Sequence, residues 1–307
     1  MDQDAVSDVV VFPNYAYQDA DESAKADNPA IGSRYDVAPD LWIGPLAEGE
    51  AQMVLKACDA PDCWSGKIPW LTAPVELYSF VREEPPRGTT ERWDEDARLT
   101  TCIALSRLVH PTSVGFHYAA RVFRDPSGAI RERDIRSGTL GGKHDFAYVA
   151  EETRDWLTIA DADELRMLMS LWPKSNLPQR ITRAMLYCDE AAYCDHINLR
   201  WTLVATAIEA LVHTDRMKST KQFVKRVPLL MAEVGGSPIS KREAEDMYEY
   251  RSALAHGEGL NQSPATLKNL YLKMEQLLRL TLLHAIQQPT FAQFLADPNQ
   301  VKAKWPV

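Results

Sequence analysis

Hydrophobic residues recur every three to four positions through the second half of the chain, a spacing that predicts helices buried on one side. Within residues 161–172, for example, Leu165, Leu168 and Met169 fall on one helical face. Further helices are predicted over residues 179–194, 196–213, 221–234, 240–257 and 263–287. Because the connections are short and no strand pattern interrupts them, we expect an all-α helical bundle over residues 159–307.

Residues that favour helix ends support these boundaries. Ser240 and Glu243 have the spacing of a capping box, in which each side chain binds the other residue's backbone N–H. Ser263 followed by Pro264 predicts a second helix start, and Gly257 predicts the end of the helix that Ser240 opens. These local signals place the ends of the last predicted helices.

The first half of the chain alternates in places between apolar and polar residues, as strands do. The pattern predicts strands over 74–83 and 113–123, and a helix over 91–109. The sequence Asp125-Pro126-Ser127-Gly128 is typical of a turn, so residues 129–136 are predicted to return as the second strand of a hairpin. Together these elements predict an α+β domain.

The expected organisation of the whole chain has three parts. Residues 1–40 are rich in Asp, Ala and Pro with little periodicity, and we expect a poorly ordered or draped arm there. Residues 41–158 are predicted to form the α+β domain, with a role in sensing a trigger or selecting a substrate. The helical bundle would occupy the remainder, residues 159–307.

Composition excludes several classes of protein. Hydrophobic residues make up 45% and charged residues 25% of the chain, as in globular proteins. The apolar stretches are too short to cross a bilayer, and none near the N-terminus resembles a secretory signal, so no membrane partner is expected. The five cysteines are an odd number scattered over the chain, which does not suit a disulfide framework. We therefore expect a cytoplasmic protein.

Charge is distributed unevenly along the chain. Residues 1–173 contain 17 Lys and Arg against 30 Asp and Glu, whereas residues 174–307 contain 17 against 13. The basic half includes a cluster of five cations that could bind an RNA backbone. Its members are Arg216, Lys218, Lys221, Lys225 and Arg226. The alternative is that they form an ordinary solvated helix face.

The sequence Arg251-x4-His256 has the chemistry of a phosphate-cleaving pair. A guanidinium suits an anionic transition state, and an imidazole can move protons near neutral pH. Residues five apart lie about 140° apart on a helix, but the expected helix end at Gly257 would let these two converge. A second copy, Arg279 and His284, lies within a helix, where Arg279 is predicted to be exposed and His284 packed or capping.

The residues themselves leave another interpretation open, in which Arg251 pairs with an acid such as Glu209 and His256 caps its helix. More of the surrounding sequence bears on this choice. In order, it comprises Arg200-Trp201-x2-Val204, Ile208-Glu209-Ala210-Leu211, Ser219-Thr220-Lys221-x-Phe223-x2-Arg226 and Met247-Tyr248-x-Tyr250-Arg251-Ser252-Ala253-Leu254-Ala255-His256-Gly257. This series, over about residues 175–290, resembles the ApeA-like HEPN domain family, which has a Trp-flanked helix ending in Glu-x-Leu, a middle basic helix and a Tyr-x2-Arg-Ser-x3-His-Gly signature.

The resemblance implies a metal-independent endoribonuclease that acts in defence or as a toxin, with its site at a homodimer interface. Arg251 would stabilise the transition state, and Glu209 would orient the pair. His256 would orient or deprotonate a ribose 2′-hydroxyl, or protonate the leaving oxygen. The substrate would be RNA, with tRNA as one candidate, and no cofactor is expected. Ser252 would contact RNA, but it stands where many catalytic members have Asn, Asp or His. The competing function is therefore a non-catalytic HEPN module that binds RNA, a nucleotide or a protein, or that only dimerises.

Other combinations of residues give weaker indications. Neither Cys58-x4-Cys63 nor Cys188-x5-Cys194-x-His196 has the spacing of a common zinc site, so buried thiols are the better prediction. The glycines near Lys143 do not have the spacing of a phosphate-binding P-loop. We expect no metal site.

Overall fold

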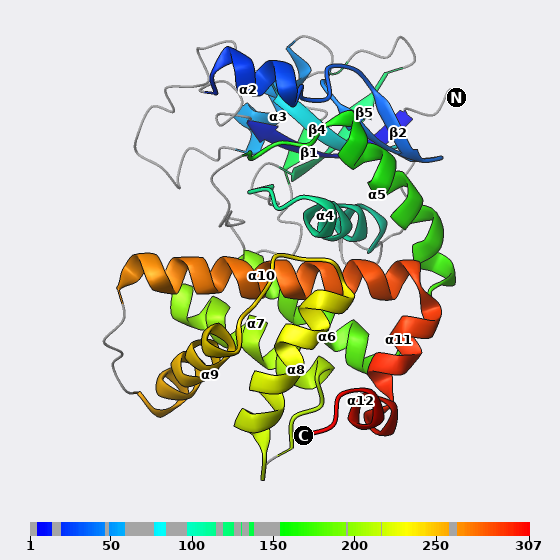
Figure 1. Ribbon diagram of the computed structural model, residues 1–307. Helices are drawn as coiled ribbons and strands as arrows, with labels where there is room; N and C mark the ends of the chain where they lie inside the picture. Colours follow the sequence, from blue (N-terminus) through cyan, green and yellow to red (C-terminus); the bar gives the residue numbers. More distant parts are fainter. Residues whose placement is uncertain are drawn as a thin grey trace. The chain divides into compact units, whose positions relative to one another are not determined.

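The chain divides into two compact units, Met1–Ser170 and Leu171–Val307 (Figure 1). The computed structural model describes residues 5–13, 20–46, 49–58, 77–83, 97–114, 119–125, 130, 135–137, 154–194, 196–215, 217–257 and 263–307. The first unit contains a β-sheet with helices, and the second is helical. The expected order, an α+β part followed by a helical part, is confirmed.

The sheet of the first unit has six strands in the order β2-β3-β4-β1-β5-β6, and every neighbouring pair is antiparallel. The strands are β1 (Ala5–Pro13), β2 (Tyr35–Ala38), β3 (Leu41–Gly44), β4 (Leu77–Glu83), β5 (Ala119–Arg124) and β6 (Ile135–Ser137). The predicted hairpin is confirmed, because β5 and β6 pair in the register Val122 opposite Ile135.

The expectation of a poorly ordered or draped arm over residues 1–40 is wrong for the described part of that segment. Strand β1 lies inside the sheet, between β4 and β5. Its residues Val9, Val10 and Val11 are at most 1% exposed, so the strand is buried on both faces. The same segment also contains α2 (Glu22–Asp27) and β2. The polar composition of the whole segment hid the short run of valines at residues 9–11. In addition, a strand that is buried on both faces shows no alternation of apolar and polar residues, so the pattern of a half-buried strand was missing.

Helices cover the sheet of the first unit. Val54 and Leu55 of α3 (Glu50–Cys58) pack into one core cluster with Val9, Val81 and other residues of that sheet face. Helix α4 (Ala97–Val109) contacts β4 and lies on the other side of the sheet in Figure 1. The predicted helix over 91–109 is thus confirmed in its second part, and residues 91–96 lie outside the described residues.

The predicted domain boundary lies twelve residues too early. Helix α5 (Ile159–Leu171) belongs almost entirely to the first unit, which ends at Ser170. The hydroxyl of Tyr35 donates to Asp163, and Arg166 Nε donates to the main-chain oxygen of Asp36 at 3.0 Å. Apolar periodicity predicted the helix correctly, but it does not show which neighbouring unit a helix packs against.

The second unit is built from consecutive helices around a long central one. They are α6 (Gln179–Ala192), α7 (Ile197–Leu211), α8 (Ser219–Glu233), α9 (Lys241–His256), α10 (Pro264–Gln287), α11 (Pro289–Ala296) and α12 (Pro298–Lys304). Helix α10 contacts α6, α7, α8 and α9, so it forms the spine of this unit. The helices predicted between residues 179 and 287 are confirmed, whereas α11 and α12 were not predicted. None of the described helices combines the length and apolar character that a membrane crossing requires.

Candidate functional site

Helix α9 presents the Arg-His motif, and both of its ends are fixed by sequence. Ser240 N–H donates to Glu243 at 2.7 Å while Glu243 N–H donates to the Ser240 hydroxyl at 3.2 Å, which confirms the predicted capping box. At the other end Gly257 has a left-handed backbone with φ 72°, a conformation that glycine adopts without steric cost. His256 is therefore the last helical residue, and it is exposed.

Arg251 lies one turn inside that helix end and forms an ion pair with α7. Its Nη2 donates to Glu209 Oε2 at 2.8 Å. The Glu209 side chain is 12% exposed and the Arg251 side chain 31% exposed, so the carboxylate is enclosed while part of the arginine side chain remains exposed. Arg251 Nε is buried and has no hydrogen-bond partner among the described residues.

Burial raises the pKa of Glu209, and the attraction and hydrogen bond of Arg251 only partly offset this effect. A carboxylate that is costly to bury retains its cationic partner tightly, because separating the two would leave an unpaired charge inside the protein. Glu209 is therefore suited to holding the guanidinium in one orientation.

The structure brings together two of the three predicted site residues. Arg251 and Glu209 are in contact, but no hydrogen bond or ion pair joins His256 to either of them within the described part of the chain. Ser252 follows Arg251 and is half-buried. A single chain thus presents an anchored arginine and a separate, exposed histidine at one helix end.

The second Arg-x4-His copy has a different environment. The His284 ring packs edge-on against Phe291, with ring centroids 4.8 Å apart, so the prediction that His284 is packed is confirmed. Arg279 is partly buried, which corrects the expectation that it is exposed. Both residues of this copy are partly buried, and His284 lies in the last turn of α10.

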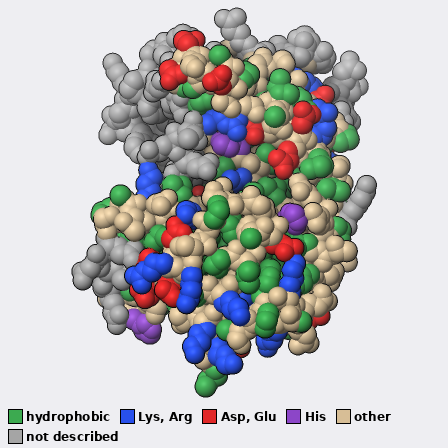
Figure 2. All heavy atoms as spheres, in the orientation of Figure 1, with side chains coloured by type: hydrophobic (Ala, Val, Ile, Leu, Met, Phe, Trp, Pro, Cys, Tyr) green, Lys and Arg blue, Asp and Glu red, His purple; other side chains and the backbone are tan. Residues whose placement is uncertain are grey.

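The predicted RNA-binding cluster divides into two groups. Lys218, Lys221 and Lys225 are exposed, on α8 or directly before it, and Figure 2 shows Lys and Arg side chains on the face of the helical unit where α8 lies in Figure 1. Arg226 is only 1% exposed, so its assignment to an RNA surface is wrong. Arg216 lies outside the described residues.

Arg226 instead joins three segments of the second unit. Its Nη1 donates to the main-chain oxygens of Val212 and His213 at 2.7 and 2.8 Å, and its Nε donates to that of Trp305 at 3.1 Å. These carbonyls belong to the turn after α7 and to the C-terminal segment. Burial lowers the pKa of Arg226, but an arginine keeps its proton at physiological pH.

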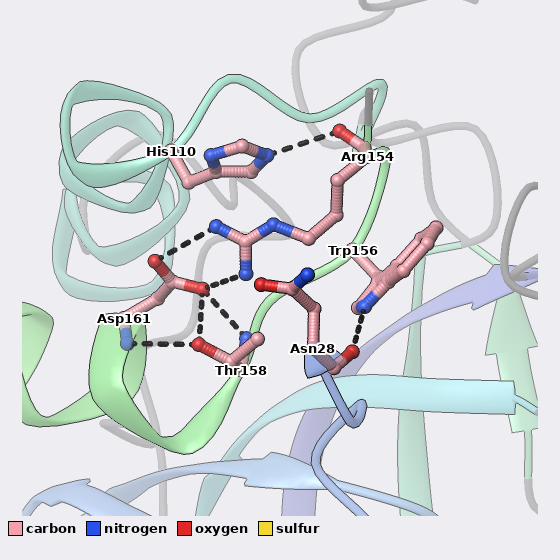
Figure 3. A network of polar contacts seen from close by, with 6 residues as sticks. All are labelled: Asn28, His110, Arg154, Trp156, Thr158 and Asp161. Carbon is pink, nitrogen blue, oxygen red and sulfur yellow. Dashed lines mark hydrogen bonds and ion pairs between the residues drawn. The ribbon is translucent and has the colours of Figure 1, made fainter. Parts of the chain in front are cut away.

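The first unit contains a polar network that sequence reasoning missed (Figure 3). Thr158 and Asp161 form a capping box at the start of α5, and Arg154 donates to both oxygens of Asp161 at 2.6 and 3.2 Å. The ring of His110 donates to the main-chain oxygen of Arg154 at 3.0 Å, and the indole of Trp156 donates to that of Asn28 at 2.7 Å. The Thr-x2-Asp spacing was the available signal. These hydrogen bonds attach residues 154–158 to Asn28, to His110 and to the start of α5.

The cysteines that suggested a zinc site make other contacts. Cys58 Sγ donates to the main-chain oxygen of Ala119 at 3.4 Å, and Cys194 Sγ to that of Glu190 at 3.2 Å. Cys63 lies outside the described residues. In the described ranges no group of three or more His, Cys, Asp or Glu side chains could hold a metal ion.

Comparison with known proteins found no relative of this chain. No family model, no curated protein and no solved structure matches the chain.

Proposed function

We propose that the protein is a metal-independent endoribonuclease of the HEPN type, whose active site forms where the α9 helices of two copies meet. The observation that supports this proposal most directly is the state of Arg251. Glu209 holds one edge of its guanidinium, yet 31% of the side chain stays exposed, one turn before the exposed His256. Phosphodiester cleavage needs an oriented arginine and an imidazole that moves protons, and the end of α9 carries one residue of each kind.

The chemistry follows from these groups. The ribose 2′-oxygen attacks the adjacent phosphorus as its proton is removed, and the bond from phosphorus to the 5′-oxygen breaks as that oxygen gains a proton. The products carry a 2′,3′-cyclic phosphate and a 5′-hydroxyl. Arg251 stabilises the charge of the phosphorane, and His256 transfers a proton. One histidine cannot be base and acid in the same step, so a second copy supplies the other imidazole.

RNA would be held by backbone phosphates on the exposed lysines. Lys221 and Lys225 lie four residues apart on one face of α8, and Lys218 directly precedes the helix. Ser252, half-buried beside Arg251, would contact the RNA at the site itself. This arrangement recognises the backbone rather than the base sequence.

A non-catalytic HEPN module is the second candidate, and one observation favours it. The Arg251–Glu209 ion pair is complete within a single chain, and no contact among the described residues draws His256 toward it. The same helix end could then bind an RNA, a nucleotide or a protein without cleaving anything.

One experiment separates these functions. Purified protein is incubated with total RNA in the presence of EDTA, beside the Arg251→Ala/His256→Ala double variant. The catalytic proposal requires cleavage by the unaltered protein alone, with 2′,3′-cyclic phosphate ends. RNA that is bound by both proteins but cut by neither would support the non-catalytic module instead.

A further inference from the structure

Two consecutive residues of α9 contact positions on α7 that are far apart. Tyr250 OH donates to Asn198 Oδ1 at 3.0 Å, and Arg251 contacts Glu209 at 2.8 Å. Asn198 and Glu209 are eleven residues apart, which on a helix is about three turns and about 16 Å. They therefore lie on the same stripe of α7, one near each end. Helix α9 therefore crosses this stripe between Asn198 and Glu209. The Tyr250 side chain extends toward Asn198, and the Arg251 side chain extends toward Glu209.

The Tyr250 ring is buried, whereas Asn198, which accepts its hydrogen bond, is exposed. The Tyr250 ring packs edge-on against Trp201 with centroids 4.4 Å apart, and Trp201 is fully buried. Trp201 Nε1 has no hydrogen-bond partner among the described residues, so packing against aromatic rings holds this indole in place. Tyr250 is thus fixed at its ring by Trp201 and at its hydroxyl by Asn198.

We propose that Tyr250, through its bond to Asn198, is a positioning residue for Arg251 that fixes the rotation of α9 on α7. Adjacent side chains on a helix point about 100° apart, so rotating α9 about its axis moves both contacts together. The Asn198 bond therefore holds the guanidinium on Glu209. The consequence for catalysis rests on the proposed function, whereas the positioning itself does not.

A matched control exists on the same helix. Tyr248 also makes a hydroxyl hydrogen bond, to the Ser219 hydroxyl at 2.7 Å, and its ring packs against Phe223 of α8. Tyr248→Phe and Tyr250→Phe each remove one hydroxyl, but only the second removes a contact to the α7 stripe. A general loss of helix packing would affect the two variants alike.

The direct test is the NMR titration of the Glu209 side-chain carbon, assigned with Glu209→Gln. Arg251 lowers the pKa of this carboxyl, so Arg251→Met should raise it. Tyr250→Phe should raise it by at least half as much, while Tyr248→Phe should leave it unchanged. Asn198→Ala removes the acceptor of the same hydrogen bond, and it is used in this test in place of Tyr250→Phe if the Tyr250 variant does not fold. Equal titration curves for the Tyr248 and Tyr250 variants would overturn the proposal.

Activity provides the second measurement. If the protein cleaves RNA, Tyr250→Phe should lower kcat by about tenfold or more with little change in KM, because a misdirected guanidinium weakens transition-state binding more than substrate binding. An unchanged kcat in an actively cleaving protein would also overturn the proposal. If the unaltered protein cleaves no RNA, the endoribonuclease function fails, and the Glu209 titration still decides whether Tyr250 positions Arg251.

Discussion

Arg226 donates a hydrogen bond at 2.8 Å to the main-chain oxygen of His213, a residue whose backbone is left-handed, with φ 52°. Few residues other than glycine adopt a left-handed backbone, and the hydrogen bonds of this turn stabilise it at His213. The His213 ring Nε2 donates to the main-chain oxygen of Leu295 at 2.6 Å. Burial lowers the pKa of His213, which favours the neutral ring near pH 7. The turn after α7 is thus fixed by a buried cation and a neutral imidazole.

The first prediction follows from this arrangement. Arg226→Met should lower the free energy of unfolding by about 2 to 4 kcal/mol, because several buried carbonyls lose their donor. Urea denaturation followed by circular dichroism measures the change. Lys225→Met is the control, since it removes an exposed cation from the adjacent position and should change stability by less than about 0.5 kcal/mol. Equal losses in the two variants would show that the Arg226 contacts contribute nothing specific.

The sequence contained a signal for the true place of Arg226. Phe223, Val227 and Leu230 are buried, and Arg226 falls among them at helical spacing. Its position in the apolar stripe therefore indicated burial, whereas Lys221 and Lys225 lie on the opposite, polar face. Counting charges along the sequence grouped all of them together, because that count ignores the direction in which each side chain points.

The second prediction concerns the exposed lysines of α8. If Lys221 and Lys225 bind backbone phosphates, Lys221→Glu/Lys225→Glu should weaken RNA binding and flatten its dependence on salt. For two contacts on a single strand the slope of log K against log salt should fall by about 1.4. Fluorescence anisotropy across a salt series gives this slope.

Its control makes the same change of charge elsewhere. Lys241 and Arg242 are 80% and 72% exposed at the start of α9, so Lys241→Glu/Arg242→Glu alters net charge equally without touching α8. A salt slope that falls equally in both variants would indicate a general charge effect, and the lysines of α8 would then form an ordinary solvated face.

Local and non-local features were predictable to different degrees. The capping box at Ser240, the helix start at Ser263 and the stop at Gly257 depend on residues within a few positions, and sequence identified all three. Strand β1 depends on pairing Val9 with Val81 and Ala120, which are distant in sequence, and it was missed. The Arg251–Glu209 contact spans 42 residues, and it was expected because the resemblance gave Glu209 the role of orienting the pair and the alternative interpretation made it an ion-pair partner.

The third prediction is a pH dependence that originates in the first unit. Burial raises the pKa of Asp155 to about 6, although the N–H and hydroxyl of Ser113 both donate to this carboxylate. In the unfolded chain an aspartate titrates near 3.9. Between these values the folded protein holds a proton that the unfolded chain releases, so stability should rise as the pH falls from about 7 to about 4. Asp155→Asn should remove on the order of 2 kcal/mol of this rise.

Asp161, in the same unit, affects the pH dependence of stability in the opposite direction to Asp155. Burial raises its pKa, but the bonds from Arg154 and Thr158 outweigh burial and lower it overall. Its contribution is present above the unfolded pKa and is lost as the pH falls through the lower folded value. Thermal unfolding is measured between pH 3 and 8. The unfolding temperature of Asp161→Asn should approach that of the unaltered protein as the pH falls. The unfolding temperature of Asp155→Asn should lack the rise that Asp155 gives the unaltered protein in acid. Parallel curves for the two variants would contradict both assignments.

The fourth prediction is that the protein forms a dimer. The proposed reaction needs two imidazoles and each chain offers one at the end of α9, so an active protein should be dimeric at assay concentration. Light scattering over a wide range of concentration, with and without RNA, measures this. An active protein that stays strictly monomeric would require both proton transfers to come from a single chain, contrary to the composite site.

The last prediction contrasts the two histidines that follow an arginine by five residues. His256 is exposed at a helix end, so His256→Ala should leave the fold intact and lower RNA cleavage by about 100-fold or more, as loss of a general acid or base does. His284 packs on Phe291, so His284→Ala should lower stability by about 1 kcal/mol while cleavage below the unfolding temperature persists. Initial cleavage rates and thermal midpoints measured on the same preparations give both values. Cleavage that survives His256→Ala but disappears with EDTA would place the chemistry outside α9, because the Arg251 and His256 mechanism needs no metal ion.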